Sequence, residues 1–380
     1  MRIVGIICEY NPFHLGHAKQ IRMIRQLHGR DCGIVCLMSG NFVQRGMPAI
    51  FDKSLRAQAA VACGADLILE LPVTYALSSA EGFAAGGVKI LSGFCDELCF
   101  GTETGTSETL TATSNALLSS EFSAALRARL ETGVSFPAAR QQALADLGAD
   151  ASLLSNPNDI LAVEYCKAII AQDSPMKPMP ILRQGCYHAP IPDTENPSAT
   201  AVRELILSGH DWKSCVPEAA QTVFSGAATH TLSAGDRAIL ARLRTMTDAE
   251  FEALPFGSEG LWRRLMHACR KYAALDEILT AVKTKRYART RLDRMVMCAF
   301  LGISREMLET PAPYARVLAF NEMGKAVLRK ARQYGVYPHT GETVDDPYQI
   351  LELRCDDLYG LFCQDAPTAP NSKRRVCILP

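Results

Sequence analysis

Two histidines spaced three residues apart carry the strongest chemical signal in this chain. His14 and His17 belong to the segment Glu9-Tyr10-Asn11-Pro12-Phe13-His14-Leu15-Gly16-His17, which follows a short apolar run at residues 3–8. Residues three apart share one helix face, so both imidazoles can donate hydrogen bonds to one anionic group. Gly16 lets a phosphate or a ring approach the backbone. The pattern therefore predicts a phosphate site at the start of a helix, where free N–H groups favour anions.

Alternating strand-like and helix-like segments are expected to position this pair. Apolar runs at residues 3–8, 34–38, 66–71 and 97–100 are typical of buried strands, and helical periodicity fills the stretches between them. Such alternation indicates an α/β fold with a parallel, Rossmann-like sheet wound by right-handed crossovers. Ligands of such sheets bind beyond the carboxyl ends of the strands, where the histidine pair would lie. The alternative is that the two histidines cap the helix or pack in a core.

Other polar positions also follow the predicted strands. The loop at residues 39–46 succeeds the second strand, and its Gln44 and Arg45 suit a carboxylate or a phosphate, although a solvated loop has the same composition. Gly101 ends the fourth strand, where a missing side chain would let adenine lie against the backbone. Asn158 suits either a ligand contact or a helix N-cap. A further charged set is expected on a solvated face: Asp52, Lys53 and Arg56.

The length of 380 residues suggests two domains. Residues 1–205 hold the strand signals, whereas residues 206–380 look mainly helical and are predicted to form a second domain. Lys plus Arg equal Asp plus Glu at 40 each, so the net charge predicts no polyanionic partner. Any nucleic-acid surface must therefore be a local patch.

Fourteen cysteines are scattered through the chain, mostly in apolar runs, without paired spacings that suit zinc. They are interpreted as buried free thiols, which implies a reducing compartment, and no metal site is expected. No apolar run reaches membrane-spanning length, and the N-terminal run is too short for a signal peptide. The chain is therefore expected to be cytoplasmic and to have no membrane partner.

The histidine segment resembles the His-x-Gly-His motif of the nucleotidyltransferase superfamily, which includes pantetheine-phosphate adenylyltransferases and class I aminoacyl-tRNA synthetases. That superfamily has a second phosphate motif, Ser-x-Thr-x-x-Arg, at the start of a late helix, and Ser198-Ala199-Thr200-Ala201-Val202-Arg203 stands in that place. The resemblance implies phosphate contacts from Ser198, Thr200 and Arg203, because hydroxyls can cap the helix and a guanidinium can clamp phosphate oxygens. An ordinary capped helix with a surface arginine is the alternative.

Several separated motifs narrow the resemblance. The chain resembles the bacterial tRNA(Met) cytidine acetate ligase family in residues 9–17, Met38-Ser39-Gly40-Asn41-Phe42-Val43-Gln44-Arg45-Gly46, Glu70-Leu71-Pro72, Phe100-Gly101-Thr102-Glu103, Asn158-Asp159-Ile160-Leu161 and Tyr187-His188. The match spans roughly the first 205 residues and continues more faintly in Ser258-Glu259-Gly260-Leu261 and Lys285-Arg286-Tyr287. Ala189-Pro190 follows His188 where an acidic residue is expected, so no role is carried over to His188.

The resemblance implies an enzyme that activates acetate with ATP and acetylates N4 of the wobble cytidine of elongator tRNA(Met). His14, His17 and Arg203 would be the catalytic residues that supply charge to the phosphates, with Mg²⁺ as the counter-ion of ATP. The ATP-binding residues that it implies are Ile7, Cys8, Glu9, Tyr10, Asn11, Pro12, Phe13, His14, Leu15, Gly16, His17, Ala18, Lys19, Gln20, Gly101, Asn158, Arg183 and Gln184.

Residues 261–295 form a basic stretch in a chain of zero net charge. Ten Lys and Arg residues stand against three acidic residues, a local net charge of +7, and Tyr272 and Tyr287 lie among them. Clustered positive charge with aromatic residues suits RNA. Solvated helix faces are the alternative. The residues expected to contact tRNA are Arg263, Arg264, Lys285, Arg286, Arg289 and Arg291.

Two other functions share parts of this pattern. A small-molecule adenylyltransferase of the pantetheine-phosphate type has the same histidine motif but needs no basic second domain. A non-catalytic RNA-binding protein would keep the nucleotide fold without turning over ATP, and the intact histidine pair argues against it. ATP–pyrophosphate exchange that depends on acetate would distinguish the ligase from the small-molecule adenylyltransferase. Turnover of ATP would distinguish the ligase from the non-catalytic RNA-binding protein.

Overall fold

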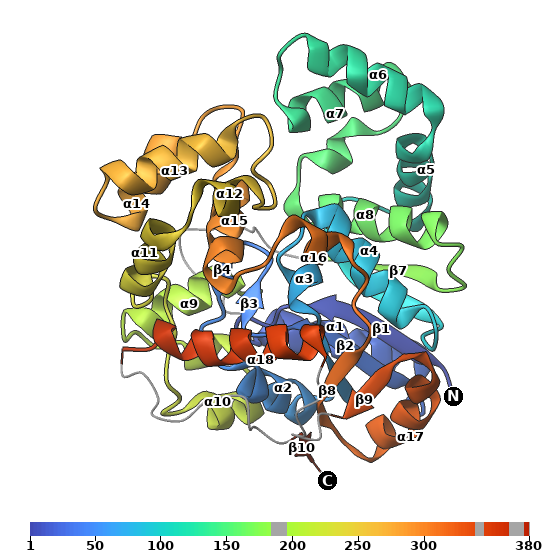
Figure 1. Cartoon of the computed structure of the whole chain (residues 1–380). Helices are drawn as coiled ribbons and strands as arrows, with labels where there is room; N and C mark the ends of the chain where they lie inside the picture. The colour runs from blue at the N-terminus through green and yellow to red at the C-terminus, as the bar shows by residue number, and fades with distance from the viewer. Residues whose placement is uncertain (184–195, 339–345, 365–375, 380) are drawn as a thin grey trace.

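An eight-stranded sheet forms the centre of the molecule, and two helical arms rise from one side of it (Figure 1). The computed structural model describes residues 1–183, 196–338, 346–364 and 376–379. Five strands of the sheet are parallel and lie in the order β5-β2-β1-β6-β7. They are β1 (Ile3–Cys8), β2 (Gly33–Ser39), β5 (Leu67–Leu71), β6 (Glu97–Thr102) and β7 (Lys177–Leu182). The predicted α/β fold with a parallel sheet is confirmed.

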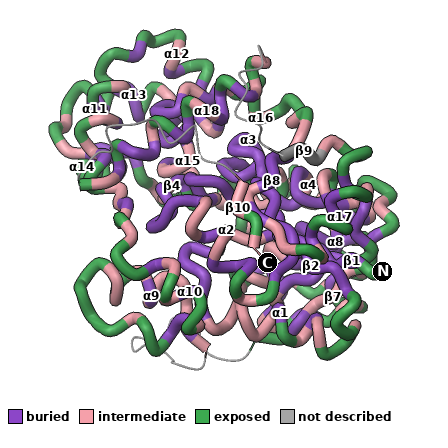
Figure 2. Tube along the Cα trace, turned by 90° about the horizontal axis from the view of Figure 1, so that it is seen from below, coloured by how far each residue is buried: buried purple, intermediate pink, exposed green. Residues whose placement is uncertain are grey.

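Side chains of the parallel strands alternate between two apolar cores. Ile3 and Ile7 of β1 face one core, and Val4 and Ile6 face the other. The first core includes α4 (Ala80–Leu91), α8 (Pro157–Ala171) and α17 (Glu322–Ala331), and the second includes α1 (Leu15–His28), α2 (Lys53–Ala62) and α10 (Glu218–Phe224). Strands covered on both faces are apolar throughout, which explains their continuous apolar runs. Figure 2 shows the buried residues concentrated along β1, β2 and β8.

The two arms come from separate parts of the sequence. The first arm consists of α5 (Ser107–Leu118), α6 (Ser120–Glu131) and α7 (Phe136–Asp146). The second has its own apolar core and consists of α11 (Asp236–Thr245), α12 (Asp248–Glu252), α13 (Leu261–Lys271), α14 (Leu275–Val282) and α15 (Arg289–Leu301). Other elements connect these parts to the sheet: the hairpin β3 (Phe42–Val43) and β4 (Met47–Pro48), with α3 (Val73–Ala76), α9 (Ala199–Leu207), α16 (Arg305–Glu309) and α18 (Pro347–Tyr359).

The second half of the chain also contributes strands, which the sequence did not predict. β8 (Ala315–Phe320) pairs antiparallel with β5, with Ile68 opposite Ala319. β9 (Val336–Pro338) and β10 (Cys377–Ile378) pair in turn with β8. Residues 206–380 are therefore helical for most of their length but also extend the central sheet. Local periodicity does not reveal this pairing, because the partner strands lie about 250 residues apart along the chain.

The charged set Asp52, Lys53 and Arg56 is buried, so the expected solvated face is wrong. Asp52 caps α2 by accepting a hydrogen bond from the Ser54 amide at 2.8 Å. The Arg56 guanidinium is fully buried and donates to the carbonyls of Glu9, Ser39 and Gly40. These carbonyls follow β1 and β2, so Arg56 ties together the two strand ends that carry the predicted site. Its partners are backbone groups, which leave no signature in residue types.

The thirteen cysteines among the described residues are free thiols, and nine of them are buried. This confirms the interpretation of the cysteines as buried thiols. Within the same residues, no helix is both long and apolar enough to cross a membrane.

Candidate active site

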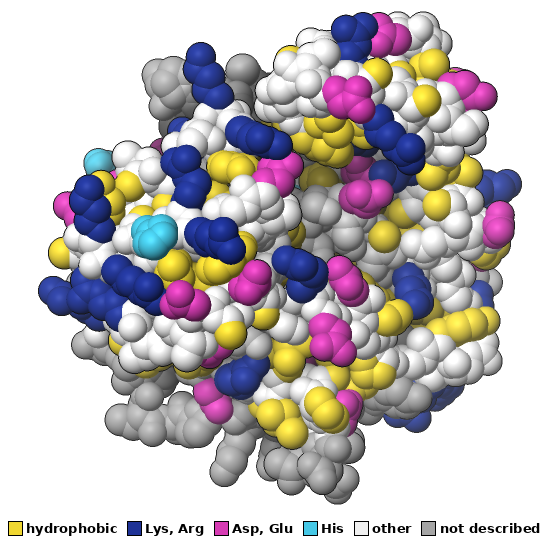
Figure 3. Space-filling model, turned by 45° about the horizontal axis from the view of Figure 1, so that its top comes forward, with side chains coloured by type: hydrophobic (Ala, Val, Ile, Leu, Met, Phe, Trp, Pro, Cys, Tyr) yellow, Lys and Arg dark blue, Asp and Glu magenta, His cyan; other side chains and the backbone are white. Residues whose placement is uncertain are grey.

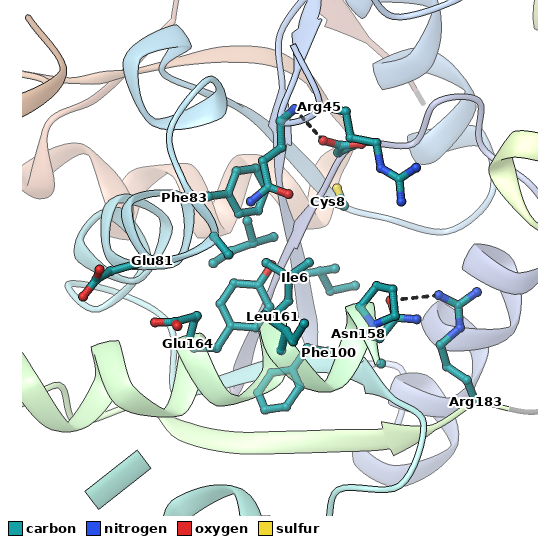
Figure 4. Close-up of a pocket in the computed structure, with 18 of the residues that line it drawn as sticks. Ile6, Cys8, Arg45, Glu81, Phe83, Phe100, Asn158, Leu161, Glu164 and Arg183 are labelled. Atoms are coloured by element: carbon teal, nitrogen blue, oxygen red, sulfur yellow. Dashed lines mark hydrogen bonds between the residues drawn. The ribbon is translucent and has the colours of Figure 1, made fainter. Parts of the chain in front are cut away.

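A pocket of about 860 Å³ opens at the carboxyl ends of β1 and β6, between the two arms. Strand β1 has β2 on one side and β6 on the other, so this is the point where the strand order reverses. Crevices at such points bind ligands in open α/β sheets. Figure 4 shows how residues of β1, β6, α4 and α8 surround the cavity. The volume lies within the usual range for small-molecule sites.

His14 and His17 both line the pocket, and both also cap α1. The Nδ1 atom of His14 accepts from the Gly16 amide at 3.1 Å, and Nδ1 of His17 accepts from the His14 amide at 3.3 Å. A neutral imidazole that accepts on Nδ1 carries its proton on Nε2. The two histidines therefore cap the helix, as the alternative interpretation expects. Capping through Nδ1 also fixes the tautomer in which Nε2 carries the proton and is a hydrogen-bond donor. The two rings are stacked with centroids 3.7 Å apart.

The two imidazoles are uncharged at neutral pH. Burial, with Arg183 and Arg203 nearby, lowers the pKa of His14 to about 3. Burial, with His14 and Arg183, holds the pKa of His17 well below its usual range. The rings therefore act as neutral hydrogen-bond donors, and positive charge in this part of the pocket must come from other side chains.

A second wall is built by the ends of β6, β7 and α8. Asn158 is the second residue of α8 and accepts from Arg183 at 3.2 Å (Figure 4), while its amide donates to Glu103. Asn156 holds the N-cap position, so Asn158 is not the N-cap. A Cβ at Gly101 would lie 2.9 Å from the Arg183 side chain, so glycine leaves room for this arginine in its observed position. All three predicted residues of this wall line the pocket.

Asp159, for which the sequence predicted no role of its own, fixes the turn after β6. Its fully buried carboxylate accepts from the Glu103 amide at 2.8 Å and from the hydroxyls of Thr102 and Thr104. Although burial alone would raise it, the hydrogen bonds from Thr102 and Thr104 lower the pKa of Asp159. The charged carboxylate thus holds the end of β6 against the start of α8.

The Ser-x-Thr-x-x-Arg segment at residues 198–203 contacts the loop that carries the histidines through the Asn11 carbonyl. Ser198 caps α9 by accepting from the Ala201 amide at 3.2 Å. Arg203 donates to the Asn11 carbonyl at 2.7 Å and to the Thr200 hydroxyl at 3.1 Å. None of Ser198, Thr200 and Arg203 lines the pocket, although the neighbouring Pro197 and Ala199 do. Arg203 therefore positions the loop between β1 and α1.

Most of the residues expected to bind ATP lie along the pocket. Four do not line it: Pro12, Phe13, Leu15 and Ala18. Phe13 is fully buried, and its ring centroid lies 5.5 Å from that of His17, so it packs against the histidine on the side away from the pocket. Gln184 and His188 lie outside the described residues. Those that line the pocket are Ile7, Cys8, Glu9, Tyr10, Asn11, His14, Gly16, His17, Lys19, Gln20, Gly101, Asn158 and Arg183.

Comparison with known proteins assigns the chain to a family. Residues 1–374 match the family model described as HIGH Nucleotidyl Transferase. The tRNA(Met) cytidine acetate ligase of Clostridium acetobutylicum is 34% identical, with all of both chains covered. That of Clostridium tetani is 36% identical over 89% of each chain. This chain belongs to the tRNA(Met) cytidine acetate ligase family.

Solved structures agree over the whole chain. Apo Thermotoga maritima TmcAL has a TM-score of 0.91 and 28% identity, and the alignment covers all of both chains. The same protein bound with alpha-thio ATP has a TM-score of 0.88 and 28% identity, with 100% of this chain and 99% of the other covered. Both halves of this family member, including the strands that residues 206–380 add to the sheet, thus belong to one shared fold.

The pocket of this family member extends beyond the predicted residues. Gln44 and Arg45 line it, so the loop at residues 39–46 is not simply solvated. Towards the first arm, the walls are aromatic, with the Phe100 and Tyr165 ring centroids 5.4 Å apart. Glu164 is buried there and pairs with Arg140 at 2.5 Å. Four charged residues that line this end and form linked ion pairs are Glu81, Arg140, Glu164 and Lys167.

The basic stretch divides into paired and unpaired cations. Arg286 pairs with Glu259, and Arg289 pairs with Asp276 and Asp293. Arg291 donates to the Phe256 carbonyl and the Ser258 hydroxyl. Five exposed members make no ion pair within the described residues: Arg263, Arg264, Lys271, Lys283 and Lys285. Lys and Arg side chains gather over the second arm (Figure 3).

The two tyrosines of the basic stretch differ in what they expose. Tyr287 is 6% exposed and packs in the core of the second arm, so its ring is not available to stack on a base. Tyr272 is partly exposed, with the Lys271 ammonium 5.3 Å from its ring centroid. Of the two, only Tyr272 is partly exposed.

Proposed function

We propose that this chain activates acetate with ATP to form acetyl-adenylate and then acetylates N4 of the wobble cytidine of elongator tRNA(Met). As a member of its family, the protein is a ligase that forms a carbon–nitrogen bond. The observation that carries the proposal is the pair of Nε2–H donors fixed by the α1 cap in the crevice beyond β1. Relatives named for this reaction align with the chain from end to end.

In the first step, an acetate oxygen attacks the α-phosphorus of ATP, and pyrophosphate leaves with the electron pair of the broken P–O bond. Negative charge develops on the phosphoryl oxygens, and preorganised donors stabilise it. His14 and His17 would donate from Nε2, and Arg183 and Lys19 would add positive charge. Because its guanidinium holds the Asn11 carbonyl, Arg203 would orient this loop. Mg²⁺, as the counter-ion of ATP, would offset the negative charge of the phosphates.

In the second step, the N4 amine of cytosine attacks the acetyl carbon. The new C–N bond replaces the bond to AMP, which leaves as the phosphate anion, and N4 loses one proton. The adenylate is already activated, so the step needs no nucleophilic side chain, only that both reactants are held together. An anticodon loop base is single-stranded and can be splayed out into such a pocket.

The proposed tRNA surface is the exposed basic face of the second arm. Arg263, Arg264 and Lys285 have no acidic partner within the described residues, so they are available to backbone phosphates. The pocket is lined by residues of this arm and of the first arm, so a loop that binds there would sit between them. Arg286, Arg289 and Arg291 belong to the same proposed surface, but their guanidinium groups are already engaged.

Incubation of the protein with labelled acetate, ATP and bulk tRNA, followed by nucleoside analysis, tests the proposal. We expect label in N4-acetylcytidine, and pyrophosphate exchange that depends on acetate. Exchange that requires a phosphorylated metabolite instead of acetate would indicate a small-molecule adenylyltransferase. Binding of tRNA without any ATP turnover would indicate a non-catalytic RNA-binding protein.

A further inference from the structure

One cation in the pocket comes from the second half of the chain. Arg294 on α15 lines the cavity together with Thr290, which lies four residues earlier and therefore on the same helix face. The close fit of the loop at residues 39–46 holds this helix in place. Gly46 has a φ of 74°, and a Cβ there would lie 2.4 Å from the Arg294 backbone nitrogen.

The Arg294 guanidinium has few partners. It donates to the Gln44 carbonyl at 3.5 Å and lies 5.1 Å from the Phe256 ring centroid. Its Nε is buried and has no hydrogen-bond partner in the described part of the chain, where no carboxylate pairs with this guanidinium either. The adjacent Asp293 is engaged by Arg289 at 2.9 Å. Most of the five N–H donors of this side chain are therefore unused.

An unpaired, partly buried cation costs free energy, because desolvation is not offset by an opposite charge. Arg286 and Arg289, by contrast, pair with carboxylates, and Arg291 makes two hydrogen bonds at 2.9 Å, to a carbonyl and to a hydroxyl. Arg294 differs from them in that it lines the pocket. A side chain with free, fixed donors in a ligand cavity is suited to an anion that arrives with the ligand.

We propose that Arg294 binds a phosphate group in this pocket, which makes the helical second half of the chain part of the active site. This rests on the proposed function, whose two large substrates both carry phosphates. The group is either the polyphosphate of ATP or a backbone phosphate next to the target cytidine. Both present paired oxygens that a planar guanidinium can bind with two hydrogen bonds.

The test compares Arg294→Gln, Arg294→Lys and the control Arg305→Gln, which removes an exposed arginine of the same half outside the pocket. Two rates are measured: acetate-dependent ATP–pyrophosphate exchange without tRNA, and acetyl transfer to tRNA. Hydrogen bonds to charged groups predict a fall of about ten- to a hundred-fold for Arg294→Gln. Arg294→Lys keeps the positive charge but cannot make two parallel hydrogen bonds to one phosphate, so we expect its rates to lie between those of Arg294→Gln and the wild type. The control stays at the wild-type rate.

The assay in which the Arg294 variants lose activity shows which phosphate group this arginine binds. A fall in exchange without tRNA assigns Arg294 to ATP. A fall in tRNA acetylation alone, with a raised KM for tRNA and a salt slope smaller by about one unit, assigns it to the RNA backbone. Near wild-type rates in both assays, or a change confined to the KM for acetate, would overturn the inference. An inactive wild-type enzyme would instead reject the proposed function. Melting temperatures of all variants show whether each one folds.

Discussion

Two sets of buried charges in this molecule differ in whether they have partners. Behind the pocket, Lys53 pairs with Glu70 at 2.8 Å and with Asp356 at 2.5 Å. Arg316 pairs with Glu70 at 2.7 Å, and also with Glu352 and Asp356. In the pocket, the histidine pair is neutral and Arg294 has no carboxylate partner within the described residues.

The difference indicates what each set is for. The paired network joins α2, β5, β8 and α18, so it connects the two halves of the chain and is complete without a ligand. The pocket wall, by contrast, holds the Arg294 Nε donor, which no group in the described residues uses. Since buried charges and donors are normally satisfied, unused ones in a cavity suit a bound anion.

The largest expected effect is on stability. Lys53→Met removes one of the two cations that pair with the buried carboxylates of Glu70 and Asp356, and Arg316 alone remains to offset them, so we expect the free energy of unfolding to fall by about 3 to 5 kcal/mol. Arg294→Met removes a cation that has no carboxylate partner, so we expect a change of about 1 kcal/mol or less. Urea unfolding of both variants measures the difference. Equal losses would show that the two cations are not distinguished by their partners.

The next effect is on catalysis. His14→Asn keeps an N-cap side chain but removes the Nε2–H donor. Loss of one donor to a developing oxyanion predicts a fall of about 100- to 1,000-fold in acetate-dependent pyrophosphate exchange. His210→Asn, at an exposed histidine outside the pocket, is the matched control. Exchange by His14→Asn near the wild-type rate, with unchanged melting, would remove the catalytic role of this imidazole.

The depressed pKa of His14 predicts how stability depends on pH. Its folded pKa of about 3 lies below that of an unfolded histidine, so the unfolded chain takes up the proton first. The free energy of unfolding is therefore highest above the unfolded pKa and falls as the pH drops towards 3. Between pH 7 and 4.5, His14→Asn should lose about 2 to 3 kcal/mol less than the wild type. Parallel profiles would mean that His14 titrates normally.

The smallest expected effect is on tRNA binding, and it compares paired with unpaired cations on the surface of the second arm. Glutamine replacement of the unpaired Arg263, Arg264 and Lys285 should reduce the slope of log K for tRNA against log salt by about 2 to 3 units. Replacement of Arg286 and Arg289, which already have acidic partners, should change the slope less. Filter binding over a salt series measures both. A larger change from the paired set would mean that these ion pairs open when RNA binds.

The sequence by itself determined the parallel sheet and the location of the site. Continuous apolar runs are a local signal, because strands covered on both faces are apolar along their whole length. The histidine motif is local too: His14 and His17 form both the helix cap and the donor pair within one turn of α1. The helix cap is observed, and because it uses Nδ1 it is compatible with the predicted role of Nε2 as a donor.

Only the tertiary structure decided which charged residues are buried, paired or in the pocket. Lys53 and Arg56 resemble surface residues in sequence, yet their partners include Asp356, about 300 residues away, and backbone carbonyls that residue types do not reveal. Arg294 is one of ten cations in a basic stretch, and only the packing of α15 against Gly46 brings it into the cavity. Periodicity reports which face of an element is apolar, whereas the electrostatic role of a side chain depends on groups that folding brings together.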